Sequence, residues 1–287
     1  MRRITALCVA AFAAASMPQL AAAAKTPKKA ATAASAPAPE AKDAATADFE
    51  KFRAILEEDN PAELFEAKGE DLWKQKRGPN KVSLEQCDLG VGPGVVKGAY
   101  VQTPRYFADA DQVMDIERRI AWCMEKLQGF KHEDLVKKPF SNPNYTPDLV
   151  SLVTYVAAQS RGMKVAIPQK HPKEIAAYKI GAEIFKYRAG PYDFACATCH
   201  GEDGRRIRMQ QLPNLASKRD AMRAYAGWPG YRMTGGLMHT LQWRMNDCFR
   251  QQRFPEPGYL SDAVTDLLTY LGVNANGNIY KGPGIKR

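Results

Sequence analysis

The sequence lacks a second apolar run after its N-terminus that could cross a bilayer, a span that takes ~20 residues. The run at residues 4–15 is itself too short, and it lies between a basic start and the small residues 22–24. This layout is typical of a cleaved secretory signal. We therefore predict a signal peptide over residues 1–24, export to the periplasm and no membrane span in the mature protein. A single N-terminal membrane anchor is the alternative.

Large apolar residues are scarce in the next segment, and no convincing series of strands follows it. Residues 25–47 are mainly Ala, Lys, Pro, Thr and Ser, which cannot bury enough surface to fold, so we predict a flexible linker. Farther along, apolar residues recur at spacings of three and four, which predicts an all-α fold. Helices are expected over residues 48–58, 113–127, 147–158, 173–187, 236–253 and 260–271, with another that begins at Asn60-Pro61.

One motif indicates a cofactor. Residues 196–200 read Cys-Ala-Thr-Cys-His, and C-x-x-C-H is the covalent attachment signature of a c-type haem. Cys196 and Cys199 would form thioethers to the haem, and His200 would be the proximal iron ligand. Because the motif occurs once, we predict one covalently bound haem c in a cytochrome c-like fold. A redox-active C-x-x-C pair and a chance match are the alternatives.

The cysteines are few, and their number after export is odd. The sequence has six, of which Cys8 lies in the predicted signal and two belong to the haem motif. Cys87, Cys123 and Cys248 remain, so one thiol is expected to stay unpaired in an oxidising compartment. We predict a Cys87–Cys123 disulfide because both lie in the half of the chain without the motif. A pairing of Cys248 with either one is the alternative.

The residue on the other side of the iron has several candidates. They lie downstream of the motif: Met209, Met222, Met233, Met238, His239, Met245 and Cys248. Methionine is the common ligand in small c-type domains and raises the reduction potential, although several of these methionines have the spacing of core residues. Cys248 differs because the cysteine count leaves it unpaired. Ligation by its thiolate would lower the potential.

An arginine accompanies this cysteine. Arg244 precedes Cys248 by four residues, so both side chains project from one face of the predicted helix. A fixed cation beside a thiol favours the thiolate, and a guanidinium presents forked donors to an oxyanion. We interpret Cys248 and Arg244 as candidate catalytic residues, and Cys248 also as a metal ligand. An ordinary surface arginine, or one that pairs with a haem propionate, is the alternative for Arg244.

An internal repeat divides the chain into two halves. "RRIAWCMEKLQGF" (118–130) and "WRMNDCFRQQRF" (243–254) each place Arg four residues before Cys, and a Pro-rich turn and a helix follow each. We expect a haem-free cytochrome c-like domain over residues 48–165 and a haem-binding one over 166–287. Near the junction, residues 160–172 look like a linker.

These features together resemble SoxA, the larger cytochrome subunit of the bacterial Sox thiosulfate-oxidising system. The resemblance covers essentially all of residues 48–280. It rests on the two-domain repeat, the haem motif in the second domain and the helix "RMNDCFRQQR". It is closest to the single-haem members of the family, in which a disulfide takes the place of the first haem.

The resemblance implies an enzyme, an L-cysteine S-thiosulfotransferase that joins thiosulfate oxidatively to a cysteine of the carrier SoxYZ. It implies a heterodimer with the small monohaem cytochrome SoxX, which passes electrons on. Cys248 matches the cysteine that ligates the iron and is found as a persulfide in the family. Arg244 matches the arginine that binds the substrate.

Two other functions remain open from the residues. A plain electron-transfer cytochrome would have a methionine-ligated haem and an inert Cys248. A two-haem thiosulfate dehydrogenase that makes tetrathionate would need two C-x-x-C-H motifs, so it ranks last. The net charge of +10 helps to attract an anion and a partner but belongs largely to solvated surface, and we predict no nucleic-acid partner.

Overall fold

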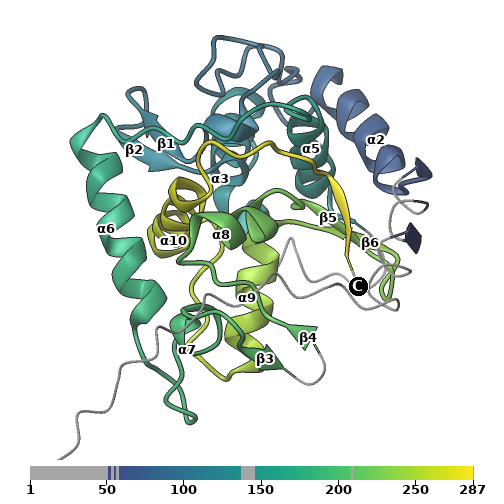
Figure 1. Ribbon diagram of the computed structural model, residues 1–287. Coiled ribbons are helices and arrows are strands. Elements are labelled where there is room, and N and C mark those ends of the chain that lie inside the picture. The colour runs from purple at the N-terminus through teal and green to yellow at the C-terminus, as the bar shows by residue number, and fades with distance from the viewer. Residues whose placement is uncertain (1–50, 53–54, 56–57, 137–145, 208–209, 287) are drawn as a thin grey trace, which may run out of the picture. The chain divides into compact units, whose positions relative to one another are not determined.

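The computed structural model describes residues 51–52, 55, 58–136, 146–207 and 210–286 (Figure 1). The predicted signal peptide and linker, and most of the helix predicted over 48–58, lie outside these residues. All described residues belong to one compact unit, Ala44–Arg287. In the ranges described, no helix is both long and apolar enough to cross a membrane.

Helices make up most of the regular structure. The α-helices are α2 (Ala62–Lys74), α3 (Ile116–Cys123), α4 (His132–Val136), α5 (Asp148–Ala158), α6 (Pro172–Lys186), α7 (Cys196–His200), α8 (Lys218–Tyr225), α9 (Leu241–Gln251) and α10 (Asp262–Asn274). A 3₁₀ turn covers Tyr100–Gln102, and a π-helical turn covers Met124–Gln128. The strands are β1 (Arg105–Phe107), β2 (Gln112–Met114), β3 (Arg206–Ile207), β4 (Gln210–Gln211), β5 (Gly230–Arg232), β6 (Leu237–His239) and β7 (Gly284–Lys286).

The strands make the all-α prediction only partly correct. β1 pairs with β2 and β3 with β4, while β5 lies between antiparallel β6 and parallel β7. Each strand has only two or three residues, which is too short to show an alternating pattern in the sequence. The β5–β7 pairing also joins segments that are far apart in the chain, so no local signal predicts it.

Side-chain caps start two helices later than predicted. The helix predicted over 113–127 begins at Ile116, because the Asp115 carboxylate accepts hydrogen bonds from the backbone N–H groups of Glu117 (3.0 Å) and Arg118 (3.2 Å). The helix predicted over 236–253 begins at Leu241, because the Thr240 hydroxyl accepts from the Trp243 N–H (3.2 Å). The residues before these caps belong to β2 and β6.

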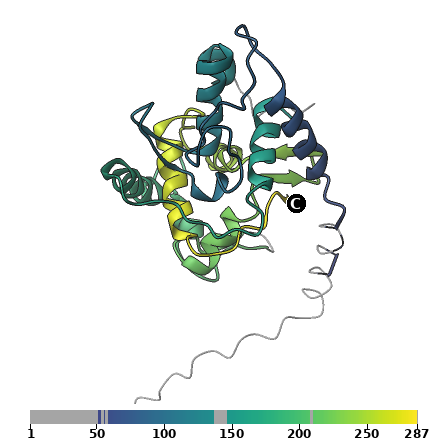
Figure 2. The same ribbon diagram turned by 90° about the horizontal axis from the view of Figure 1, so that it is seen from above.

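Two helix pairs cross closely at glycines. In the first half, α2 packs on α5, and a Cβ at Gly69 would collide with the Ser151 carbonyl and the Tyr155 Cβ (Figures 1 and 2). In the second half, α6 packs on α10, and a Cβ at Gly181 would collide with the Asp266 carbonyl and the Tyr270 Cβ. A residue without a side chain lets the backbones of each pair approach.

A buried polar network connects α3 of the first half to α9 and α10 of the second. The Asp115 carboxylate accepts hydrogen bonds from Gln242 Nε2 (2.9 Å) and Thr265 Oγ1 (2.8 Å). Glu117 lies beside it, and Glu117 Oε1 is 3.5 Å from the backbone nitrogen of Gln242. All four side chains are buried. The start of α9 is therefore held by residues about 125 positions earlier in the chain.

Residues 160–172, which look like a linker in the sequence, are hydrogen-bonded to the segment after α10. The Val165 N–H donates to the Asn278 carbonyl (2.8 Å), and the Ile167 N–H donates to Asn276 Oδ1 (2.7 Å). Val165 and Ile167 are buried. These contacts lie within the predicted junction at residues 160–172.

A disulfide joins Cys87 to Cys123, the last residue of α3. Their Cα atoms are 5.8 Å apart, and both side chains are buried in the core of the first half. The bond closes a sequence separation of 36 residues. Cys196, Cys199 and Cys248 remain as free thiols.

Candidate functional site

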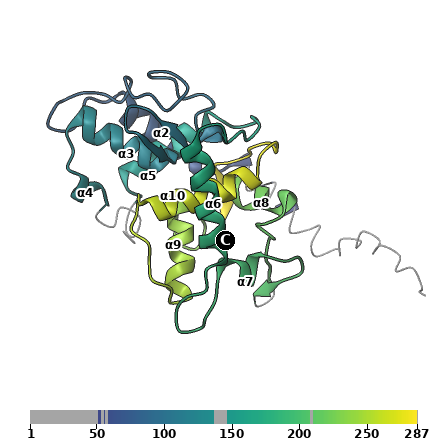
Figure 3. The same ribbon diagram turned by 90° about the vertical axis from the view of Figure 1, so that its left-hand side faces the viewer.

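Helix α7 carries the C-x-x-C-H motif at the same end of the unit as α9, and both helices lie below α10 in Figures 1 and 3. The helix begins after Ala195, whose backbone N–H donates to the Thr198 hydroxyl (2.9 Å). One short helix thus presents Cys196, Cys199 and His200 together. All three side chains are partly buried.

The His200 imidazole is oriented by a backbone carbonyl. His200 Nδ1 lies 2.9 Å from the Pro213 carbonyl oxygen, which can only accept, so Nδ1 carries the proton. The other ring nitrogen, Nε2, keeps its lone pair for a metal. Burial lowers the pKa of His200, the Pro213 carbonyl opposes this shift, and Arg244 adds to it. The ring is therefore neutral at pH 7, as a metal ligand must be.

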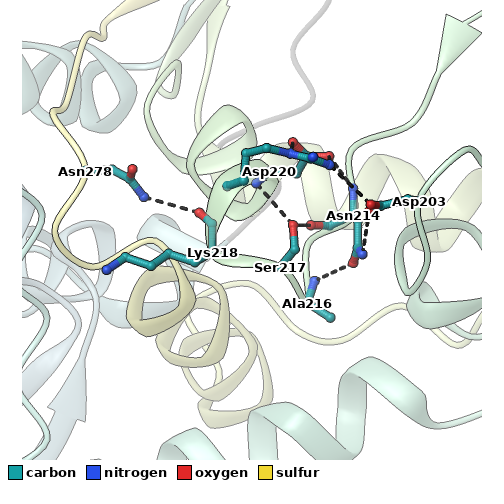
Figure 4. Close-up of polar contacts among 8 residues, drawn as sticks. Asp203, Asn214, Ala216, Ser217, Lys218, Asp220 and Asn278 are labelled. Atoms are coloured by element: carbon teal, nitrogen blue, oxygen red, sulfur yellow. Dashed lines mark hydrogen bonds and ion pairs between the residues drawn. The ribbon is translucent and has the colours of Figure 1, made fainter. Parts of the chain in front are cut away.

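A polar network fixes the loop that supplies this carbonyl (Figure 4). The Asn214 side chain donates to Asp203 (2.8 Å), and its backbone N–H donates to Asp220 (3.2 Å). The Ser217 hydroxyl donates to the Asn214 carbonyl (3.0 Å). Leu215 N–H donates to the carbonyl of His200 itself (2.8 Å). On the other side of Pro213, the Leu212 N–H donates to the Arg205 carbonyl (2.8 Å), so the loop is held at both sides.

Helices α7 and α9 face each other across a cavity of about 280 Å³. Cys196, Cys199 and His200 line it from α7, and Arg244, Met245 and Cys248 line it from α9. Most of the remaining wall is apolar, from Phe185, Phe194, Ala195, Ile207, Leu212, Pro213, Leu215, Ala224, Trp228, Leu241, Phe249, Phe254, Leu267 and Leu271. The structure brings together all five residues predicted for the haem and thiol site.

This donor set fits haem c. The thiols of Cys196 and Cys199 lie beside a neutral imidazole whose Nε2 can bind iron. The sulfur of Cys248 faces them across a cavity with largely apolar walls, which suit a porphyrin. Burial raises the pKa of Cys196, with a smaller contribution from Cys248, which places the two thiols within electrostatic reach. Cys196 and Cys199 would hold the haem covalently, and His200 and Cys248 could bind the iron.

The pKa of the Cys248 thiol differs from our expectation that Arg244 would favour the thiolate. Burial raises the pKa of Cys248, and the lowering by Arg244 is smaller. Asp247 also raises this pKa, while Arg232 lowers it. The protein surroundings alone therefore favour the thiol, and a metal ion is the kind of added charge that deprotonates a coordinating sulfur.

Of the residues that the sequence analysis proposed for the other side of the iron from His200, Met245 and Cys248 line the cavity among those that the structure describes. His239 is stacked on Trp243, with ring centroids 3.8 Å apart, and burial followed by Arg232 lowers the pKa of His239 to about 4. Met238 is buried in β6, and Met233 is 48% exposed. Met222 lies on α8 and is not among the lining residues, and Met209 lies outside the described residues.

Asp247 is a feature that the sequence analysis missed. Its carboxylate accepts hydrogen bonds from Arg244 Nη1 (3.0 Å), Arg250 Nη2 (2.5 Å) and Gln251 Nε2 (2.8 Å). Arg232 Nη1 from β5 lies 3.6 Å away. The spacing Arg-x-x-Asp-x-x-Arg around Cys248 was a signal for this cluster, because residues three apart on a helix are neighbours.

The arginine at the matching place of the predicted repeat has a different setting. Arg119 is 2% exposed, donates two hydrogen bonds to Asp109 (2.9 and 2.7 Å), and lies between the rings of Phe107 and Trp122. Arg244 lines the cavity, and its side chain is 38% exposed. The shared spacing of Arg and Cys therefore serves packing in one half and a cavity wall in the other.

Comparisons with known proteins show the family of the chain. The family model of the SoxA/TsdA cytochrome c domain matches residues 68–165, which lie in the half without the haem motif. The L-cysteine S-thiosulfotransferase subunit SoxA of Hydrogenophilus thermoluteolus is 45% identical over 239 residues, covering 83% of this chain and 87% of that protein. A SoxA of Hydrogenobacter thermophilus is 33% identical over 225 residues, covering 78% and 83%.

A solved structure shares the fold. The crystal structure of SoxXA from P. pantotrophus matches with a TM-score of 0.67 at 25% identity, covering 83% of this chain and 84% of that chain. The cytochrome c fold, which implies haem c, and the resemblance predicted from the sequence are thereby confirmed. The chain belongs to the family of the SoxA subunit of L-cysteine S-thiosulfotransferase.

Proposed function

We propose that this chain binds one haem c in its second half and uses it to attach thiosulfate to a cysteine of a SoxYZ-type carrier protein. Cys196 and Cys199 would form the thioethers that hold the haem, and His200 Nε2 and Cys248 Sγ would be available to bind its iron. The shared cavity of α7 and α9 supports this assignment. The names of the relatives, L-cysteine S-thiosulfotransferase, support the reaction class.

In the overall reaction, thiosulfate and the carrier thiol lose two electrons and one proton as a sulfur–sulfur bond forms between them. When bound, haem c would supply an acceptor for these electrons next to Cys248. All other steps fall to residues of the chain and of the carrier. The product is a carrier cysteine that bears an S-thiosulfonate group.

The chain's residues would carry two bond exchanges. First, the Cys248 thiolate bonds to the outer sulfur of thiosulfate, and two electrons depart. Then the carrier thiolate attacks that outer sulfur, its bond to Cys248 breaks, and the Cys248 thiolate returns. Arg244 binds the sulfonate oxygens during both exchanges, because a forked guanidinium matches an oxyanion. A sulfane sulfur held on Cys248 as a persulfide would take the place of Sγ in the same steps.

A SoxX-type monohaem cytochrome is the partner that we propose for electron transfer. The solved structure similar to this chain is of a SoxXA complex, which supports a SoxX partner. Both proteins would work in the periplasm after removal of the predicted signal, residues 1–24. The mature chain and its partner would form a heterodimer.

We also propose that the two halves, residues 48–165 and 166–287, are repeats of one cytochrome c-like plan, with only the second holding haem. The glycine crossings support this proposal, since Gly69 faces Tyr155 as Gly181 faces Tyr270. The disulfide at Cys87 and Cys123 would stabilise the half without the cofactor.

The observation that carries the function is the position of Cys248 on the cavity wall that faces the C-x-x-C-H motif. Two variants test it in the haem-loaded complex: Cys248→Ser, and Met245→Leu, which removes the other sulfur that lines the cavity from α9 but keeps the volume of the buried side chain. We expect Cys248→Ser to abolish the mass increase of the carrier by one thiosulfonate group. Met245→Leu should retain it.

The ferric haem spectrum separates the remaining alternative, a plain electron carrier. Ligation by Met245 would give the weak long-wavelength absorption band of methionine-ligated ferric haem, and Met245→Leu would remove this band. We expect the band to be absent and the spectrum to change in Cys248→Ser. Full conjugation by Cys248→Ser would refute the proposed role of Cys248. Mass spectrometry of the wild-type peptide would show whether extra sulfur is present.

A further inference from the structure

The Asp247 cluster, which consists of Arg232, Arg244, Asp247 and Arg250, collects three guanidinium groups on one carboxylate. Arg244 and Arg250 donate to different Asp247 oxygens at 3.0 and 2.5 Å, and Arg232 lies 3.6 Å from Oδ2. The arginines come from two elements, α9 and β5. The carboxylate is therefore the common centre of the group.

The Asp247 side chain is the least exposed of the cluster, and the three arginine side chains around it are more exposed. The Asp247 side chain is 4% exposed, while those of Arg232, Arg244 and Arg250 are 27%, 38% and 61% exposed. Arg244 also lines the cavity beside Cys248. The carboxylate is thus buried beneath cations that reach from the cavity wall toward the solvent.

The cluster has more positive than negative charge. Three guanidinium groups surround one carboxylate, so two positive charges exceed it, which is the charge needed to balance a dianion. Guanidinium groups offer pairs of donors that match the oxygens of a tetrahedral oxyanion, and partly buried cations are screened less by salt than exposed ones.

We propose that Asp247 is a positioning residue that holds Arg232, Arg244 and Arg250 together as a binding site for a doubly charged tetrahedral oxyanion next to Cys248. This inference rests on the proposed function, in which thiosulfate is that dianion. Arg244 touches the anion in this arrangement. Asp247 acts only through the arginines.

Mutual repulsion explains why the carboxylate is needed. Like charges at close range disfavour each other, so without Asp247 the more exposed Arg244 and Arg250 would turn toward solvent. Arg232 has a second support, since its guanidinium lies over the Trp243 ring at 5.2 Å. Loss of the carboxylate would thus raise the local positive charge and still weaken anion binding, because the donors would no longer converge.

Sulfate is a suitable probe, because it is a tetrahedral dianion without the sulfane sulfur that reacts. Its dissociation constant would be measured by calorimetry on the haem-loaded complex with the partner cytochrome. The variants are Asp247→Asn, Arg244→Gln and the double variant. Asp148→Asn is the matched control, because Asp148 also pairs with two cations, Arg77 (2.6 Å) and Lys68 (3.0 Å), but does not line the cavity.

We expect Asp247→Asn and Arg244→Gln each to weaken sulfate binding by about tenfold, which corresponds to about 1.4 kcal/mol. The double variant should lose less than the sum of the two single losses, because both variants remove the contribution of Arg244, and coupled residues show such non-additivity. Asp148→Asn should bind sulfate as the wild type does. The ferric haem spectrum of Asp247→Asn should match that of the wild type, which shows that Cys248 keeps its place.

Unchanged or tighter sulfate binding in Asp247→Asn would overturn the inference, and so would fully additive losses in the double variant. Failure of the inference is distinguishable from failure of the proposed function. The former leaves the Cys248→Ser result intact and shows normal sulfate affinity in Asp247→Asn. The latter appears as conjugation by Cys248→Ser, whatever the sulfate affinities are.

Discussion

At the scale of residues, one spacing of Arg and Cys has two physical outcomes. Arg119 is enclosed by two aromatic rings and a carboxylate, and Arg244 borders the cavity that holds the haem motif. A buried guanidinium is tolerated only with its partners, since an uncompensated buried charge is costly. The same substitution should therefore affect stability at one site and ligand binding at the other.

Arg119→Gln should lower the free energy of unfolding by about 3 kcal/mol, because it leaves Asp109 and the Asp88 carbonyl without their charged donor. Arg118→Gln is the neighbouring control: Arg118 pairs with Asp262, which is 82% exposed, and exposed pairs contribute about 0–1 kcal/mol. Denaturant titration of the haem-loaded protein measures both. Equal losses in the two variants would contradict the role of burial.

A second residue-scale prediction concerns the buried Glu117. Burial, and then the nearby Asp115, raises the pKa of Glu117 well above its ordinary 4.5. Among the described side chains, Glu117 Oε2 is a buried oxygen without a hydrogen-bond partner. The folded protein thus holds this proton more tightly than the unfolded chain. The resulting stabilisation is complete below pH 4.5 and is lost as the pH rises through the folded pKa.

Glu117→Gln, which keeps the shape of the neutral carboxyl group, should remove this dependence on pH. We expect the difference in unfolding free energy, variant minus wild type, to increase from pH 5 to pH 8 by up to about 1.4 kcal/mol per pH unit. Denaturant titrations at several pH values provide the measurement. A constant difference across this range would show that Glu117 ionises normally in the fold.

At the scale of elements, close helix crossings position the site. Helix α6 precedes the haem motif in the chain, with residues 187–195 between them, and its packing on α10 depends on Gly181. Two helices can pack this closely only where at least one of them has no side chain at the contact. The crossing thereby fixes where the chain enters α7.

Gly181→Ala should destabilise the protein by about 1–3 kcal/mol, because the new Cβ would overlap the Asp266 carbonyl and approach the Tyr270 Cβ to 2.9 Å. Gly258→Ala is the control, since a Cβ there would meet only the Ser261 Cβ, at 3.9 Å. Thermal unfolding midpoints compare the two. A gain in stability at Gly181, as expected for alanine in an open helix, would mean that the helices can separate without cost.

The existence of the helices could be predicted from the sequence, and the haem motif could be recognised in it. The residues at which helices begin and the side chains that form clusters could not be predicted in full. Apolar spacing located the helix of residues 147–158 within one residue at its start, since α5 begins at Asp148. The predicted start of α9 was wrong because residues 237–239 form a strand too short to show an alternating pattern and Thr240 caps the helix after it. Cys248 could be predicted as a site residue because the cysteine count left its thiol unpaired. The spacing of Arg244, Asp247 and Arg250 was a signal for part of the Asp247 cluster, but no local spacing indicates Arg232, which comes from a different element.

At the scale of the whole molecule, the two halves are stabilised by different covalent means. The first half has the Cys87–Cys123 disulfide, and the second has the thiols suited to thioether bonds. A cross-link that closes a separation of 36 residues restricts the unfolded chain over that length. The disulfide therefore acts mainly on stability and leaves the haem site alone.

The double variant Cys87→Ser/Cys123→Ser should lose roughly 3–4 kcal/mol of unfolding free energy, as loop-closure entropy predicts. Its haem spectrum and its conjugation of thiosulfate at 25 °C should match those of the wild type. Denaturant titration and absorption spectroscopy test both statements. A changed haem spectrum in the folded variant would show that the first half controls the second directly.

Asp115 shows what the first half contributes to the second. One carboxylate caps its own helix and also receives Gln242 and Thr265 from α9 and α10. A shortened chain that began at residue 166 would leave Gln242 and Thr265 without this acceptor, and Gln242 lies two residues before Arg244 on α9. The half without the haem motif therefore helps to hold the helix that presents Cys248, although none of its described residues lines the cavity.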